Sequence, residues 1–117
     1  MLSIAPGTRI FFAAGGTDMR KGFDGLQGIV SGVLEQDPLS GHLFLFINRR
    51  RDKLKILYWD GDGLAIWYRR LEQGTFQVPH VAADQKSAEI RSEELTMLLR
   101  GIDYHNVRRR KRYCFAS

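Results

Sequence analysis

The chain lacks most of the features that mark secreted, membrane-spanning or zinc-binding proteins. Its 117 residues include one cysteine, Cys114, so no disulfide can form within the chain and a cysteine-based zinc site would lack thiolates. The longest apolar run, Leu43 to Ile47, is far too short to cross a bilayer. The N-terminus has neither the charged segment nor the long apolar segment of a signal peptide. We therefore expect a cytoplasmic protein with no membrane partner.

Recognisable catalytic and metal-binding motifs are also missing. His42, His80 and His105 are far apart and show no ligand spacing, and no serine stands in a nucleophile-elbow context. Cys114 lies in a basic segment that cannot hold a base and an oxyanion hole in place. Asp60-Gly61-Asp62-Gly63 begins like a calcium loop but lacks the later ligands, so we interpret it as a hairpin turn. We expect no enzyme activity, no cofactor and no bound metal.

The positive charge is concentrated in two places. Lysine and arginine number 18 against 13 aspartates and glutamates, a formal charge of +5. Five of these cations form the run Arg108-Arg109-Arg110-Lys111-Arg112, and without them the chain balances at 13 against 13. Five more are Arg49, Arg50, Arg51, Lys53 and Lys55, offset only by Asp52. A mildly acidic body with two basic sites favours an anionic partner, although both clusters could simply be solvated.

Composition and pattern predict one α+β domain. An apolar fraction of 44% is enough for one hydrophobic core. Strands are predicted over 9–14, 42–48, 54–60 and 64–71, with 42–48 central, a short edge strand at Phe76–Pro79 and an extended piece at 87–91. Helices are predicted over 19–35 and 93–100, with Ser92 capping the second and Gly101 ending it. We expect a mainly antiparallel, twisted sheet of about five strands with two helices packed on it, over residues 1–105. Residues 106–117 would form a basic C-terminal arm.

The first predicted helix is rich in glycine and follows a glycine-containing loop. Four glycines at near-helical spacing predict a flat helix face against which another backbone packs closely. A weak helix stabilised by tertiary contacts explains the glycines equally well. The loop begins at Gly15, and Thr17, Arg20 and Lys21 near a helix N-terminus form a possible anion site. The loop matches neither a P-loop nor a dinucleotide fingerprint, and Asp18 would repel an anion. An ordinary capped helix start is therefore the favoured interpretation.

Cations and aromatic rings are interleaved over residues 49–70. The cations are Arg49, Arg50, Arg51, Lys53, Lys55, Arg69 and Arg70, and the rings are Tyr58, Trp59, Trp67 and Tyr68. Rings on a sheet with flanking cations can stack exposed bases and hold phosphates. The alternative, favoured for either tryptophan, is that the rings belong to the core. Loop arginines have no reason to be buried, so the loop at 49–53 is the stronger candidate.

Several stretches, in order along nearly the whole chain, carry a family resemblance. They are Gly15-Gly16-Thr17-Asp18-Met19-Arg20-Lys21-Gly22-Phe23-Asp24-Gly25-Leu26, the segment 37–46, Asn48-Arg49-Arg50-Arg51-Asp52-Lys53 through Gly63, Tyr68-Arg69-Arg70-Leu71-Glu72-Gln73-Gly74-Thr75-Phe76, and Leu98-Leu99-Arg100-Gly101-Ile102-Asp103. In this ordered set the chain resembles the TnpB-type accessory proteins encoded by one large family of bacterial insertion sequences. These proteins share only a name with the RNA-guided nucleases called TnpB.

The resemblance implies an accessory factor for DNA transposition, encoded beside a separate transposase that carries the catalytic carboxylates. It implies no catalytic residues, and the density of the run from Arg108 to Arg112 departs from the family pattern. We predict that the chain binds DNA electrostatically, at element ends or on nonspecific duplex, mainly through phosphates.

The alternative is a protein-interaction module that docks on the transposase without contacting DNA. It would use the glycine face of the first helix or an open edge strand near Phe76. The sequence leaves open whether the ligand is DNA or RNA, the sequence specificity and the oligomeric state.

Overall fold

A computed structural model of the protein describes residues 4–103 and 108–109. Its elements are β1 (Ile10–Ala13), α1 (Phe23–Gly32), β2 (Leu43–Ile47), β3 (Lys53–Trp59), β4 (Leu64–Arg70), β5 (Ser87–Ile90), α2 (Ser92–Arg100), β6 (Ile102–Asp103) and β7 (Arg108–Arg109). The first five strands form one sheet in the order β4-β3-β2-β1-β5, while β6 and β7 pair separately. The predicted α+β fold, with a five-stranded sheet and two helices, is confirmed.

The sheet is mixed because a helix separates its first two strands. β1 and β2 run parallel, with Phe11 opposite Phe44, and α1 lies in the long connection that a parallel pair requires. The other three pairings are antiparallel, so the prediction of a mainly antiparallel sheet is confirmed. β3 and β4 meet at the predicted tight turn, where the Asp60 N–H donates to the Gly63 carbonyl at 3.0 Å and Gly61 has a φ of 103°.

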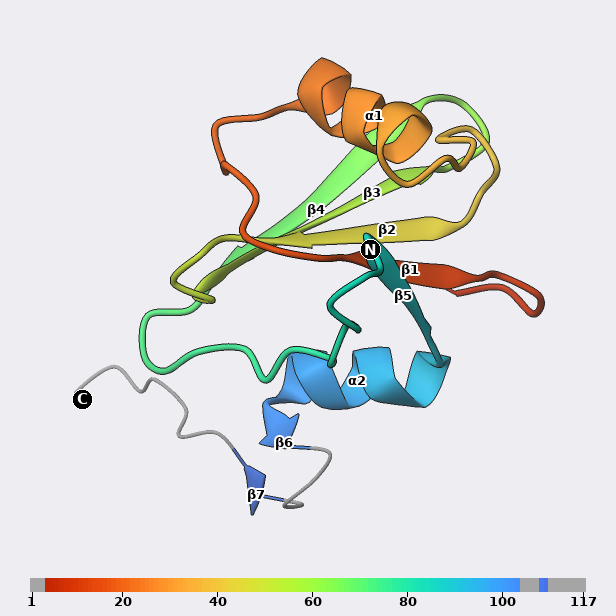
Figure 1. The fold of residues 1–117 in the computed structure, drawn as a ribbon. Coiled ribbons are helices and arrows are strands. Elements are labelled where there is room, and N and C mark those ends of the chain that lie inside the picture. Colours follow the sequence, from red (N-terminus) through yellow and green to blue (C-terminus); the bar gives the residue numbers. More distant parts are fainter. Residues whose placement is uncertain (1–3, 104–107, 110–117) are drawn as a thin grey trace.

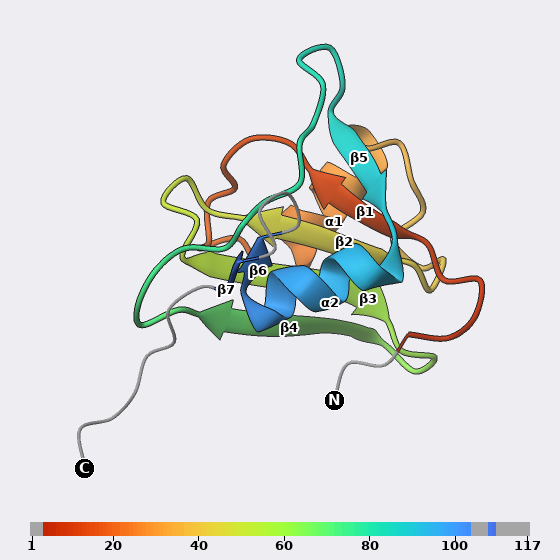
Figure 2. The ribbon, with the colours of Figure 1, turned by 90° about the horizontal axis from the view of Figure 1, so that it is seen from below.

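The two helices cover opposite faces of the sheet, as Figure 1 and Figure 2 show. Leu26 and Val30 of α1 pack in one core with Phe44 and Phe46 of β2. Leu95 and Leu98 of α2 pack in a second core with Leu45 and other inward side chains. Every residue of β2 is buried, as expected for a central strand with both faces covered.

α1 begins at Phe23 rather than near residue 19, so the predicted helix start is wrong. Residues before it form a turn, in which the Asp18 carboxylate accepts the Arg20 N–H at 2.9 Å. The Asp18 carbonyl accepts the Lys21 N–H at 3.1 Å. Aspartate favours such local bonds to the backbone over helix, which explains the later start. At its other end α1 stops at Gly32, and Glu35 takes a positive φ of 56°.

The glycines of α1 contact no other backbone among the described residues. A Cβ added at Gly28, at Gly32 or at Gly22, which precedes the helix, would meet no atom within 4 Å, and the nearest atoms to a Cβ on Gly25 belong to the Lys21 side chain. Leu26 and Val30, both fully buried, hold the helix on the sheet. Of the two interpretations of the glycines, the structure supports a weak helix stabilised by tertiary contacts.

The edge strand predicted at Phe76–Pro79 does not form. The Phe76 N–H donates to the Arg51 carbonyl at 2.7 Å, and the Phe76 ring is buried in the core on the α2 side. Burial of this ring draws the segment across the sheet as a loop. The sheet instead ends at β5, the extended piece predicted at 87–91, which pairs with β1.

The C-terminal part agrees with the predictions in some respects. α2 includes Ser92, with Arg91 as its N-cap, so the predicted cap is one residue late; Gly101 ends the helix with a φ of 78°, as predicted. Arg108 and Arg109 form β7, which pairs with β6. Arg110, Lys111 and Arg112 lie outside the described residues, and the domain boundary at residue 105 stays a prediction.

Candidate nucleic-acid interface

The loop between β2 and β3 lies against the glycine loop that follows β1, on the left side of the sheet in Figure 1. The Thr17 N–H donates to the Ile47 carbonyl at 2.7 Å. A Cβ on Gly16 would lie 3.0 Å from the Arg49 nitrogen and 3.1 Å from its Cα, so this close approach requires glycine. The basic loop and the possible anion loop were predicted separately, and the fold joins them into one surface.

Asn48 and Asp52 brace the loop between β2 and β3. Asn48 Oδ1 accepts the N–H groups of Asp52 and Lys53, both at 3.0 Å, and Asn48 Nδ2 donates to the Asp52 carboxylate at 2.6 Å. The amide hydrogen bond holds the pKa of Asp52 below its ordinary value. The Arg51 N–H also donates to the Asn48 carbonyl at 3.0 Å. The loop is ordered before any ligand binds, which reduces the entropy lost on binding.

Sequence reasoning missed Asn48 and Asp52 as positioning residues. The signal that could have found them is an asparagine and an aspartate enclosing three arginines between two strands. Both side chains readily bond to nearby backbone N–H groups in turns.

Four cations of this loop have no acidic partner among the residues that the structure describes. Arg49, Arg50 and Arg51 are exposed, and Lys53 is half-buried. Across residues 4–103, no carboxylate lies within ion-pair distance of any of them. We name Arg49, Arg50, Arg51 and Lys53 the basic hairpin surface. Lys53 also lies directly opposite Arg70 on β4, where like charges repel and an anion would relieve the repulsion.

Lys55 is not part of that surface, although the sequence placed it in the cluster. Its side chain is buried at 8% exposure, and Nζ donates to the carbonyls of Met19 at 2.7 Å and Lys21 at 2.8 Å. The ammonium also lies 4.8 Å from the centroid of the Tyr68 ring. Lys55 therefore holds the turn that precedes α1, and its charge is already satisfied inside the protein.

Arg69 and Arg70 lie on opposite faces of β4, and each is already engaged. Arg69 donates to the Leu99 carbonyl at 3.0 Å near the C-terminus of α2, and its guanidinium stacks 4.7 Å from the Trp67 ring centroid. Arg70 pairs with Glu72 at 2.8 Å, and that hydrogen bond raises the pKa of Arg70. Arg70 remains exposed beside Lys53, whereas Arg69 is directed to the α2 side.

The predicted anion site at Thr17, Arg20 and Lys21 has a different geometry from the one expected. No helix begins there, and the Thr17 N–H is taken by β2. Arg20 is paired with Asp18 at 2.7 Å. Hydrogen bonds from the Arg20 side chain and backbone lower the pKa of Asp18 from 3.8 to about 2. Asp18 therefore stays ionised at neutral pH and neutralises Arg20.

Two hollows open beside the basic hairpin surface. The first, the helix-side hollow of about 540 Å³, is lined by Thr17, Arg20, Arg49, Arg50, Lys53 and Tyr68 among others. The second, the strand-end hollow of about 660 Å³, is lined by Gly15, Gly16, Arg49, Arg51 and residues 78–83 among others. Arg49 lines both, so the loop forms a basic ridge between two concave surfaces. Sequence reasoning did not connect residues 78–83 with this site.

Two of the four aromatic rings support the core interpretation, and Trp59, also half-buried, lies at the far end of β3, opposite Leu64. Tyr58 and Trp67 are half-buried and pack against the core on the α2 side. Tyr68, on the α1 side, is 50% exposed and lines the helix-side hollow. Of the rings considered for base stacking, Tyr68 is therefore the one that faces both solvent and the basic hairpin surface.

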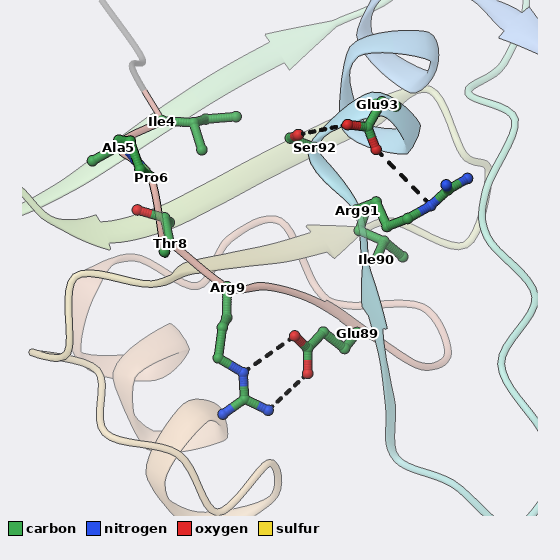
Figure 3. A pocket seen from close by; sticks show the side chains of 11 residues that line it. Ile4, Ala5, Pro6, Thr8, Arg9, Glu89, Ile90, Arg91, Ser92 and Glu93 are labelled. Atoms are coloured by element: carbon green, nitrogen blue, oxygen red, sulfur yellow. Dashed lines mark hydrogen bonds and ion pairs between the residues drawn. The ribbon is translucent and has the colours of Figure 1, made fainter.

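Figure 3 shows a third hollow, of about 530 Å³, between residues 4–9 and the start of α2. Its cations are balanced by carboxylates. Arg9 pairs with Glu89 at 2.7 Å, and Arg91 lies 3.9 Å from Glu93. A hollow with compensated charge attracts an anion less strongly than the basic hairpin surface does.

The described residues contain no cluster of three histidine, cysteine or acidic side chains that could hold a metal ion. Neither α1 nor α2 combines the length and the apolar character that a helix needs to cross a bilayer.

Comparison with known proteins gives consistent matches over nearly the whole chain. The family described as IS66 Orf2-like protein matches residues 8–109. Two proteins of Sinorhizobium fredii (strain NBRC 101917 / NGR234), both called uncharacterized, are similar along most of their length. Protein y4jC is 34% identical over 110 residues, covering 94% of this chain and 92% of its own. Protein y4hO is 38% identical over 106 residues, covering 91% and 90%. No solved structure gives a significant match.

Proposed function

The chain belongs to the IS66 Orf2-like family of transposition-associated accessory proteins, and from this premise we propose that it binds DNA and assists a separately encoded transposase. DNA would lie on the basic hairpin surface, with its phosphates beside Arg49, Arg50, Arg51 and Lys53. The transposase would perform the chemistry. The protein would act by holding DNA for the transposase.

One observation carries the proposal: among the described residues, four cations gathered on one braced loop lack carboxylate partners, whereas four arginines elsewhere on the surface are paired. Arg9, Arg20 and Arg70 each have an acidic partner within 2.8 Å. Unpaired cations on an ordered backbone are suited to bind the evenly spaced charges of a phosphate chain. The described part of the chain presents no helix with a row of base-reading side chains, which favours contacts to phosphates over base readout.

The test is a salt titration of binding to DNA duplexes with element-end and random sequences. A variant with Arg49→Gln, Arg50→Gln and Arg51→Gln should reduce the log-log salt slope by roughly 2.7, since each phosphate contact contributes about 0.9. A matched control carries Arg9→Gln, Arg91→Gln and Arg100→Gln. It removes the same charge from other surfaces and should change the slope little. Equal effects of the two variants, or no binding at low salt, would contradict the proposal.

A second candidate function, docking on the transposase without DNA, is favoured by exposed apolar side chains at the two ends of α1. Phe23 is 49% exposed and Val33 is 45% exposed, and neighbouring glycines face open space. Exposed apolar side chains beside a flat backbone are typical of helix-docking surfaces. Co-purification with the transposase that survives nuclease and high salt, and is lost with Phe23→Ser and Val33→Ser, would support this function.

A further inference from the structure

The strand-end hollow lies at the place in the sheet where ligands of α/β proteins commonly bind. β1 and β2 are parallel neighbours, and their carboxyl ends are at Ala13 and Ile47. Such ligands sit in the crevice outside the carboxyl ends of parallel strands, where the connecting loops diverge. Here the loop after β1 leads to α1, and the loop after β2 is the basic hairpin surface. The hollow is therefore directly next to the proposed phosphate contacts.

The lining of the hollow suits a flat heteroaromatic ring. Its volume, about 660 Å³, is within the usual range of small-ligand sites, roughly 300–1,000 Å³. Val78, Pro79 and Val81 provide apolar walls, and His80 and Gln85 provide polar groups that can hydrogen-bond to a base edge. The third hollow offers no such combination, because its lining consists mainly of paired charges and the N-terminal segment.

The rim of the hollow suits a phosphate. Arg49 and Arg51 both line it, and neither has a carboxylate partner among the described residues. Gly15 forms another part of the rim, where the lack of a side chain lets a ligand approach the backbone. A ring site with two cations at its edge matches the shape and charge of one nucleotide.

We propose that the strand-end hollow binds one unpaired nucleotide of a DNA strand whose neighbouring phosphates contact Arg49 and Arg51. The inference rests on the proposed DNA binding and adds to it a preference for unpaired DNA. In an intact duplex each base is stacked between its neighbours and cannot enter a concave site. A protruding strand end leaves its bases free to enter the hollow.

The experiment compares binding to a blunt duplex with binding to the same duplex carrying a short single-stranded extension. We expect the wild-type protein to bind the extended duplex about fivefold more tightly or better, as the gain from holding one base predicts. Ala83→Trp fills the hollow with an indole from an exposed lining position. It should abolish the preference while changing the blunt-duplex affinity less than about twofold. Gln77→Trp, exposed in the same segment but outside the lining, should keep the preference.

A second variant protects the test against misfolding of Ala83→Trp. His80→Ala removes one exposed lining side chain, and it should reduce the preference with no loss of thermal stability. A free deoxynucleoside monophosphate should abolish the preference for the extended duplex without weakening binding of the blunt duplex. This result would show that the hollow binds a free nucleotide as well as one within a DNA strand.

The outcomes separate this inference from the proposed function. Equal binding of blunt and extended duplexes overturns the nucleotide site and leaves DNA binding in place. A preference that survives both Ala83→Trp and His80→Ala also overturns the site. An RNA extension bound more tightly than the DNA extension overturns the assignment to DNA. Failure to bind any duplex at low salt overturns the proposed function, and the nucleotide site with it.

Discussion

Replacing Arg51 with glycine should stabilise the fold and weaken DNA binding at the same time. Arg51 has a φ of 62°, in the left-handed region. Residues other than glycine adopt this conformation at a cost of about 1–2 kcal/mol in conformational free energy. Its backbone N–H and carbonyl bond to Asn48 and Phe76, and glycine would keep both bonds. The fold alone therefore favours glycine at this position, and the arginine side chain contributes a charge rather than stability.

The expected sizes follow from the backbone and the charge. Relief of the left-handed conformation is offset by the larger backbone entropy of glycine in the unfolded chain, about 0.5–1 kcal/mol. The net gain for Arg51→Gly is up to about 1 kcal/mol, which corresponds to a rise in Tm of roughly 4 °C in a domain of this size. Loss of one phosphate contact should lower the log-log salt slope of DNA binding by about 0.9.

Arg50→Gly is the matched control, because Arg50 has the same charge and exposure on the same loop. Its φ is not positive, so glycine there relieves no strain and should destabilise the protein by about 0.5–1 kcal/mol. Thermal unfolding and fluorescence anisotropy over a series of salt concentrations measure the two effects. The reasoning is refuted if Arg51→Gly unfolds at a lower temperature than Arg50→Gly, or if neither variant changes the salt slope.

Three further predictions test other parts of the site. Asp18→Asn frees Arg20 and should steepen the salt slope by about 0.9, whereas Asp24→Asn, an equal charge change at an exposed site on α1, should not. The hydrogen bonds from Arg20 lower the pKa of Asp18 in the folded protein to about 2. Their contribution to stability is therefore present above about pH 4 and is lost as the pH falls to about 2. The stability of Asp18→Asn should lack this pH-dependent loss in acid unfolding. Lys55→Met leaves two carbonyls without their donor and should destabilise the protein by roughly 2–4 kcal/mol in denaturant unfolding, with no change in the salt slope. A chain ending at Asn106 loses five cations and should show a slope lower by up to about 4.5.

Much of the sheet could be predicted from local pattern. The apolar run around Phe44 predicted a central strand, and Asp60 to Gly63 predicted the hairpin, because both depend on residues close in sequence. The start of α1 could not be predicted in this way. Besides the local bond of Asp18 to the Arg20 N–H, it depends on Lys55, a residue of β3 distant in sequence, which donates to the carbonyls of the same turn. The pattern around Phe76 likewise predicted a strand, but Phe76 lies in a loop because its ring is buried in the core on the α2 side.

The sequence by itself determined that the cations are clustered, and that one cluster lies in a loop between two strands. It could not determine which cations are available to a ligand. Lys53 and Lys55 are two residues apart on the same face of β3, yet one is half-buried at the end of the strand and the other is covered by the turn before α1. Only the tertiary structure decided this, because the burial of a side chain depends on what packs over its strand. The same packing placed the glycine loop and residues 78–83 around Arg49, which no local pattern records.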